Sequence, residues 1–171
     1  ISARAEQRFR VGHPSIYRSD VVDVPAEGGD IVEVIGPRRR IIGQALFSDR
    51  SQIPVRMLTR GEVVADVALI RTRLEQAIRF RESLQLDATA YRLVHGEGDL
   101  LPSLIVDRYE DYLVVQAPSQ GMDRLLREVT AFLVERFAPA GVLARNDPKV
   151  RTLEGLEQTV KVLHGNVPDV I

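Results

Sequence analysis

The 171-residue chain contains no cysteine. Disulfide bonds, thiolate zinc sites and a cysteine nucleophile are therefore excluded from it. It also lacks any run of about 18 apolar residues, which excludes a transmembrane helix and a membrane partner. The N-terminal residues do not contain the apolar core of a secretory signal, so we expect a cytoplasmic location. Because residue 1 is isoleucine and not methionine, we expect the chain to be a processed or shortened form.

Sequence motifs that bind phosphate or activate a nucleophile are also missing. There is no G-x-x-x-x-G-K-[ST] loop and no G-x-S-x-G elbow. Gly96 and Gly98 are followed by no third glycine and open no helix, so they do not form a dinucleotide fingerprint. The three histidines, His13, His95 and His164, lack the spacing of a ligand pair. We therefore expect no catalytic residue, no metal site and no cofactor-binding site in this chain.

Charge is unevenly distributed along a chain whose net charge is only −1. Residues 1–60 hold ten Arg and Lys against seven Asp and Glu, whereas residues 95–171 hold eight against twelve. A basic segment joined to an acidic remainder is typical of some nucleic-acid-binding surfaces. A chance fluctuation gives the same numbers, so the charge pattern does not by itself identify a partner.

The first third of the chain has the pattern of short strands separated by turns. Residues 4–10 are consistent with a short helical turn. Residues 31–35 alternate strictly between apolar and polar side chains, and residues 41–47 and 53–59 follow as further strands. Paired glycines and the GPRRR segment supply turns between them. This pattern predicts a small β-barrel over residues 1–62.

The pattern changes near residue 61, where apolar residues begin to recur at helical spacing. Two amphipathic helices are predicted, over residues 66–86 and 122–137. Predicted strands cover residues 89–94, 103–109, 112–118, 141–146 and 159–165. We expect residues 63–171 to form a central α+β domain in which both helices pack on an antiparallel sheet. Residues 166–171 have the pattern of the start of another strand, so we expect the chain to lead into a further segment of the protein.

The stretch HGEGDLLPSLIVDRY, residues 95–109, gathers carboxylates around two glycines and a proline. Glu97, Asp99 and Asp107 have the hard oxygen ligands that Mg²⁺ binds, so a metal-dependent hydrolase is one alternative. A proline and an apolar strand separate Asp99 from Asp107, and glycine and aspartate are also typical turn residues. We interpret the stretch as a turn between two strands.

Basic and polar residues of the predicted barrel are the candidates for contacts with nucleic acid. The GPRRR turn is a possible phosphate contact and equally a solvated turn. The SQIPVR segment offers groups that reach phosphate, sugar or base edges, and equally forms a polar loop. The candidate RNA-binding residues are Arg10, His13, Arg18, Arg38, Arg39, Arg40, Ser51, Gln52 and Arg56.

Several stretches together resemble a known family. They are GHPSIYRSDV, GGDIVEV, SQIPVRMLT, YRLVHGEGDLLPSLIVDRYEDYLVVQ, RNDPKVRTLEGL and LHGNVPDVI. Their order is similar to that in bacterial S-adenosylmethionine-dependent 23S ribosomal RNA (cytosine-C5) methyltransferases. The resemblance implies an N-terminal PUA RNA-binding barrel, a central α+β domain and a C-terminal Rossmann-type methyltransferase domain. It also implies that the cofactor site and the nucleophilic cysteine belong to that third domain, which this chain does not contain.

The sequence departs from the family pattern at three positions. Ser15 stands where the family has tryptophan after His-Pro, which removes a large aromatic from the predicted barrel. Leu100 and Ser103 stand where glycines are common. These two replacements predict a less strained turn, which favours a structural role for the acidic stretch.

These observations predict the RNA-recognition and positioning portion of an S-adenosylmethionine-dependent ribosomal RNA methyltransferase. The expected partners are ribosomal RNA and the protein's own methyltransferase domain, while the sequence leaves homodimer formation open. A stand-alone RNA-binding adaptor without catalytic activity is the other reading.

Overall fold

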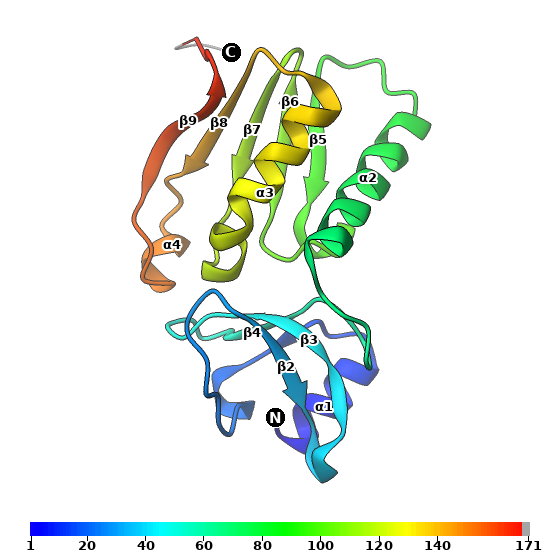
Figure 1. Cartoon of the computed structure of the whole chain (residues 1–171), viewed down its shortest axis with the longest axis vertical. Helices are drawn as coiled ribbons and strands as arrows, with labels where there is room; N and C mark the ends of the chain where they lie inside the picture. The colour runs from blue at the N-terminus through cyan, green and yellow to red at the C-terminus, as the bar shows by residue number, and fades with distance from the viewer. Residues whose placement is uncertain (169–171) are drawn as a thin grey trace.

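The computed structural model describes residues 1–168. Two β-sheets lie one above the other along the longest axis of the molecule, and each carries its own helices (Figure 1). The N-terminal sheet follows the first helix in the chain. Its elements are α1 (Ala3–Arg10), β1 (Ser15–Ile16), β2 (Ile31–Ile35), β3 (Ile41–Phe47) and β4 (Val55–Met57).

The N-terminal sheet is open and antiparallel. Its strand order is β1-β4-β3-β2, and Ile31 of β2 stands opposite Leu46 of β3. Within the described part of the chain, the edge strands β1 and β2 do not pair with each other. The predicted barrel is thus not closed. One reason is that the segment between α1 and β2 contributes only the two-residue β1 before it turns into a 3₁₀ helix at Arg18–Asp20.

A small apolar core holds α1 against this sheet. Ala5 and Phe9 of the helix are buried together with Ile16, Val34, Phe47 and Val55 from the strands. Ser2 begins the helix by accepting a hydrogen bond from the backbone N–H of Ala5 (3.1 Å), which satisfies a free donor of the first turn.

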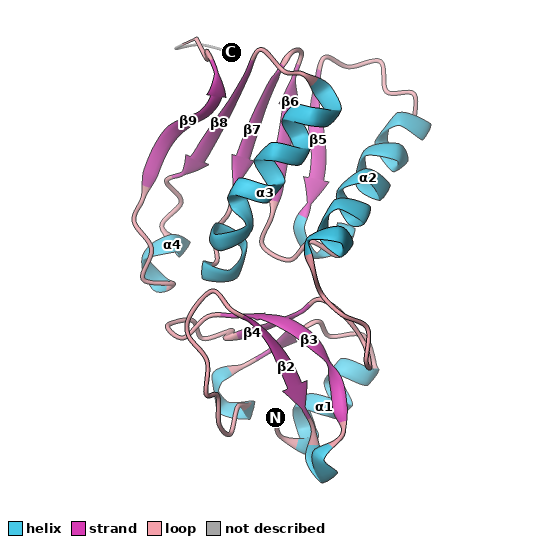
Figure 2. Ribbon diagram, in the orientation of Figure 1, coloured by secondary structure: helices cyan, strands magenta, loops and turns pink. Residues whose placement is uncertain are grey.

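The second sheet contains the remaining strands. Its elements are α2 (Val67–Ser83), β5 (Ala90–His95), β6 (Ile105–Tyr109), β7 (Tyr112–Gln116), α3 (Gln120–Phe137), β8 (Gly141–Asn146), the short α4 (Val150–Leu153) and β9 (Thr159–Gly165). The order is β5-β6-β7-β8-β9, and α2 and α3 lie on the same face (Figure 2). The α+β class and both amphipathic helices are confirmed.

One pairing of the central sheet differs from the prediction. β7 and β8 are parallel, with Leu113 opposite Val142, whereas the other neighbours are antiparallel. The sheet is therefore mixed, and the expected antiparallel sheet was wrong at this position. The cause is α3, which connects β7 to β8 as a crossover and returns the chain to the same end of the sheet.

The central core extends into the N-terminal sheet. Leu46 of β3 is 1% exposed and belongs to the same apolar cluster as Leu74 of α2 and Met122 of α3. Gly121 permits this contact, because a Cβ atom at that position would lie 2.6 Å from the Cβ of Leu46. The central core thus reaches the N-terminal sheet, whose own smaller core around α1 is a separate cluster.

The acidic stretch is a turn, as predicted, but it is not a relaxed one. A 3₁₀ helix covers Gly96–Asp99, and Leu100 and Ser103 follow with φ angles of 57° and 62°. Both residues occupy the left-handed region, where a Cβ atom is unfavourable. The prediction of a less strained turn at Leu100 and Ser103 was therefore wrong.

The predicted strand over residues 166–171 has only its first half in the described region. Residues 166–168 are not in a strand, and residues 169–171 lie outside the described residues.

Candidate RNA-binding surface

The turn between β2 and β3 carries two exposed arginines. A 3₁₀ turn at Pro37–Arg39 places Arg38 and Arg39 at φ angles of 65° and 54°. Positive φ is uncommon for residues with a Cβ atom and costs of order 1 kcal/mol or more each. The turn places both guanidinium groups at the far end of the hairpin, where solvent and a polyanion can reach them.

Beside this turn, Arg10 and Arg40 share one carboxylate. The side chain of Glu6 accepts hydrogen bonds from Arg10 at 2.8 and 3.1 Å and also from Arg40. Burial acts to raise the pKa of Glu6, but the hydrogen bonds and positive charges of Arg10 and Arg40 outweigh it, so the pKa is lowered. Glu6 is therefore ionised at neutral pH, and two arginines against one carboxylate leave a net positive charge.

A third arginine joins this group from the end of the N-terminal region. The guanidinium of Arg60 lies 4.2 Å from the ring centroid of Phe9, a cation–π arrangement. A cavity of about 210 Å³ is lined by Glu6, Phe9, Arg10, Arg40 and Arg60 together with Ile41 and Ile42. We call Arg10, Arg40 and Arg60 the arginine cluster. Arg60 was missed by the sequence reasoning, because it follows β4 and no sequence motif links it to Phe9.

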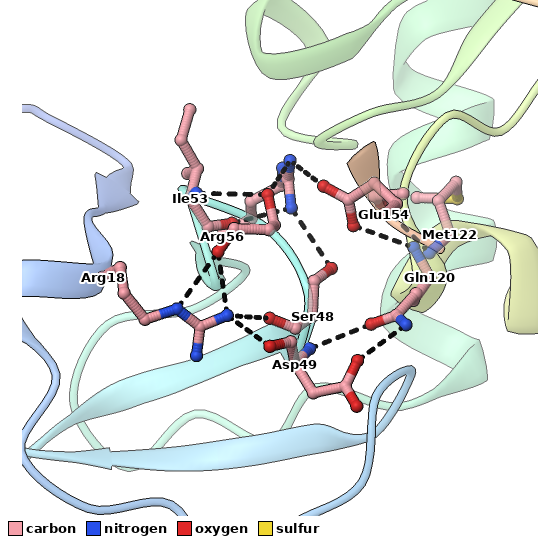
Figure 3. Close-up of polar contacts among 10 residues, drawn as sticks. Arg18, Ser48, Asp49, Ile53, Arg56, Gln120, Met122 and Glu154 are labelled. Atoms are coloured by element: carbon pink, nitrogen blue, oxygen red, sulfur yellow. Dashed lines mark hydrogen bonds and ion pairs between the residues drawn. The ribbon is translucent and has the colours of Figure 1, made fainter. Parts of the chain in front are cut away.

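Other candidates lie in a polar network at the opposite end of β3 (Figure 3). Arg18 donates hydrogen bonds to the backbone carbonyl of Ser51 at 2.8 and 3.2 Å and also to those of Ser48 and Asp49. Ser51 is 6% exposed, and its hydroxyl accepts from the backbone N–H of Ile53. These contacts hold the loop between β3 and β4 in place.

Arg56 connects that loop to the central domain. Its guanidinium donates to the Ile53 carbonyl at 2.9 Å and to the Glu154 carboxylate at 2.8 Å. Burial acts to raise the pKa of Glu154, whereas the hydroxyls of Ser48 and Ser51 and the charge of Arg56 lower it, and the lowering prevails. Glu154 therefore stays ionised, and its pair with Arg56 is a shielded link between the N-terminal sheet and the segment after α4.

A second link runs beside it. The side-chain amide of Gln120, the first residue of α3, exchanges hydrogen bonds with Asp49: it accepts from the backbone N–H at 2.9 Å and donates to the carboxylate at 2.8 Å. The backbone N–H of Gln120 also donates to Glu154. Arg124, one turn further along α3, donates to the Gly28 carbonyl and pairs with Asp30. Together these contacts fix the N-terminal sheet on the end of α3.

The predicted residues therefore fall into two groups. Arg38 and Arg39 project beside the arginine cluster at one end of β3, and the exposed His13 follows α1. Arg18, Ser51 and Arg56 make internal contacts at the other end, where Gln52 is exposed. Which of the nine side chains contacts RNA stays a prediction.

Two of the three carboxylates in the acidic stretch form ion pairs with arginines. Asp99 forms a bidentate ion pair with Arg81, and Asp107 forms a bidentate ion pair with Arg92. In residues 1–168, no three His, Cys, Asp or Glu side chains are grouped as ligands for a metal ion. Over the same residues, no helix has the length and apolarity needed to cross a bilayer.

Comparison with known proteins agrees with this architecture. Residues 1–60 match the family model described as a PUA-like domain. Ribosomal RNA large subunit methyltransferase I of Aliivibrio fischeri is 35% identical over 169 residues, which cover 95% of this chain and 42% of the relative. The corresponding protein of Tolumonas auensis is 34% identical over 161 residues, which cover 91% of this chain and 41% of the relative. Residues 1–60 form a PUA-like domain, and the chain is homologous to these methyltransferases. It spans about two fifths of their length.

Solved structures share the fold of the whole described chain. The crystal structure of SMU.776, a methyltransferase complexed with SAH, superposes with a TM-score of 0.81 at 16% identity and covers 98% of this chain. A SAM-dependent methyltransferase from Streptococcus mutans gives a TM-score of 0.79, also at 16% identity. This chain covers 42% and 44% of those two chains. The fold of this chain is thus contained within larger solved structures.

Proposed function

We propose that this chain is the RNA-recognition and positioning portion of a class I S-adenosylmethionine-dependent ribosomal RNA methyltransferase. The observation that carries the proposal is its similarity, over more than 90% of its length, to proteins named ribosomal RNA large subunit methyltransferase I. In the proposed reaction, the full-length protein methylates C5 of a cytosine in large-subunit ribosomal RNA.

In this proposal, residues 1–62 bind RNA through the end of the domain that carries Arg38, Arg39 and the arginine cluster. Phosphate contacts supply most of the affinity of such proteins, because each neutralised phosphate releases condensed counterions. Arg10 and Arg40 share the single carboxylate of Glu6, and Arg60 lies over Phe9, so the arginine cluster keeps a net positive charge for a polyanion. Guanidinium groups suit this role because their planar donors match phosphate oxygens.

Residues 63–171, as the central domain, position the RNA-binding domain in a fixed geometry. Support for this role comes from the shared core at Leu46 and from the ion pair between Arg56 and Glu154. A rigid connection matters because methyl transfer requires the target carbon within near-attack distance of the donor.

The chemical step is assigned to a part of the protein outside this chain. A cytosine C5 atom is too weak a nucleophile to take up a methyl group until a cysteine adds covalently to the ring. This chain has no cysteine and no glycine-rich loop of the kinds that hold nucleotide cofactors. We therefore expect isothermal titration of the 171-residue chain with S-adenosylmethionine to give no stoichiometric heat. A stoichiometric heat would overturn this division of roles.

The RNA-binding proposal is tested by a salt titration. Replacement of Arg38 and Arg39 by serine removes two candidate phosphate contacts without touching the core. Fluorescence anisotropy with a labelled ribosomal RNA fragment should show weaker binding. A plot of log K against the logarithm of the salt concentration should have a slope that is shallower by about 2. The matched control is Arg127→Ser on α3, whose pair with Glu128 is exposed. Equal affinities and slopes for both variants would refute this placement of the RNA-binding surface.

A further inference from the structure

We infer that the central domain carries a second RNA contact, a pocket for one unpaired base on the face of the central sheet opposite α2 and α3. We call this face the far face. The inference rests on the proposed function, and it adds a binding site that is separate from the arginines of the N-terminal domain. It assigns a ligand class, a nucleobase, to residues 90–109.

The pocket follows from strand register. Val94 of β5 and Val106 of β6 are fully buried on the side that packs against α2 and α3. On β6, Asp107 and Tyr109 alternate with Val106 and therefore lie on the far face. Their partners on β5, Arg92 and Ala90, lie there too, because the register shifts between Arg92 and Val94 and interrupts the alternation along that strand. A cavity of about 440 Å³ is lined there by Ala90, Tyr91, Arg92, His95, Asp107 and Tyr109. Its volume is sufficient for a nucleobase.

The polar groups of this pocket are held in a fixed geometry. The guanidinium of Arg92 donates to the two carboxylate oxygens of Asp107 at 2.8 and 3.2 Å. The hydrogen bonds that Arg92 donates to Asp107 raise the pKa of Arg92, so its guanidinium stays charged. The Nδ1 atom of His95 lies 3.4 Å from the same guanidinium. The guanidinium donors of Arg92 and the carboxylate acceptor of Asp107 therefore lie side by side in the lining of the cavity.

This combination favours a base over a phosphate group. A phosphate diester has acceptors only, and the carboxylate of Asp107 would repel it. The Watson–Crick edge of every nucleobase has at least one N–H donor beside an acceptor, so it can engage Asp107 and Arg92 together. An unpaired base is required, because in a duplex that edge is already occupied.

An aromatic surface adjoins the polar groups. Tyr109 is 37% exposed at the rim of the cavity, and it stands directly opposite Tyr112 across the β6–β7 pair. Neighbouring tyrosine rings on an open sheet face give unpaired bases a stacking surface. The far face thus combines stacking with hydrogen bonding, which are the two interactions that hold single-stranded RNA bases.

The test compares two RNAs and three forms of the full 171-residue chain. The RNAs are a single-stranded octamer and the same octamer annealed to its complement. The variants are Tyr109→Ala and the control Phe80→Ala, which removes an exposed aromatic from α2 on the other side of the sheet. Tyr109→Ala should bind the single strand about tenfold more weakly than wild type, with an unchanged salt slope. Its binding to the duplex should equal that of wild type, and Phe80→Ala should leave both unchanged.

Tyr109→Phe and circular dichroism separate this effect from misfolding. The phenylalanine variant keeps the stacking ring, so it should bind the single strand within about twofold of wild type. As a direct probe, ultraviolet cross-linking of a 4-thiouridine octamer should label the peptide that contains residues 90–109. If wild type binds RNA but Tyr109→Ala binds the single strand equally well, the base pocket is wrong and the proposed function stands. If wild type binds neither RNA, the proposed function fails and this inference falls with it.

Discussion

The guanidinium of Arg56 donates a 2.8 Å hydrogen bond to Oε1 of Glu154, a residue 98 positions later in the chain. The two side chains are only 11% and 2% exposed, although Arg56 lies in β4 of the N-terminal sheet and Glu154 follows α4. Salt and water compete weakly with a pair that is so well shielded. This ion pair and the Leu46 contact beside Gly121 join the two sheets through buried contacts.

Replacement of Glu154 by glutamine should destabilise the protein by about 3 kcal/mol. The substitution keeps the shape of the side chain but leaves the buried charge of Arg56 without its partner, which is the costly way to break such a pair. Urea denaturation followed by circular dichroism measures the change in the free energy of unfolding.

Glu128→Gln is the matched control for this variant, because Glu128 pairs with Arg127 at the surface of α3. Exposed pairs contribute about 0–1 kcal/mol, so the control should unfold close to wild type. If the two variants lose equal stability, the link between the domains is not a buried ion pair.

The same pair should give the protein an acid-sensitive component of stability. The pKa of Glu154 in the folded protein lies below the ordinary value of 4.5, the value it regains on unfolding. Its contribution is therefore complete above about pH 4.5 and is lost as the pH falls through the folded pKa. The difference in unfolding free energy between wild type and Glu154→Gln should shrink as the pH is lowered below 4.5. Urea titrations at a series of pH values measure it, and a difference that stays constant down to pH 3 would contradict the assignment.

The sequence predicts the elements with strong local periodicity and misses what depends on distant partners. The strands at residues 31–35, 41–47 and 159–165 have the predicted bounds, because apolar runs bounded by turn residues are a local signal. The parallel β7–β8 pairing was missed, since a crossover depends on where α3 packs and not on the strand sequences.

The candidate site shows the same division. The exposed turn with Arg38 and Arg39 is visible in the sequence, because glycine and proline mark it. The internal contacts of Arg56 are not visible, since its partner Glu154 follows about a hundred residues later. Arg60 was missed for a similar reason, because its contact with Phe9 is formed only after α1 packs against the sheet.

Replacement of Gly121 by alanine should destabilise the protein, although alanine is the better helix former by about 1 kcal/mol. The new Cβ atom would lie 2.6 Å from the Cβ and 2.9 Å from the Cδ2 of Leu46, so β3 and α3 would have to separate. Overpacking of this kind costs about 1–3 kcal/mol. Thermal unfolding should show a lower Tm for Gly121→Ala.

A control, Ala131→Gly at an exposed position of α3, tests helix propensity alone. An unchanged or higher Tm for Gly121→Ala would mean that the two sheets are not in close contact at Leu46.

Replacement of Leu100 by glycine should stabilise the protein. Leu100 has a φ angle of 57° and its side chain is 59% exposed, so it holds an unfavourable backbone conformation with little apolar burial in return. Glycine removes about 1–2 kcal/mol of left-handed strain and adds about 0.5–1 kcal/mol of chain entropy to the unfolded state. The net gain should raise Tm by about 1–4 °C, measured by differential scanning calorimetry. Leu100→Ala is the control, because it removes the same exposed side chain but keeps the Cβ atom, and its Tm should stay at or below that of wild type. If glycine gives no higher Tm than alanine, the turn does not store the strain that its backbone angles indicate.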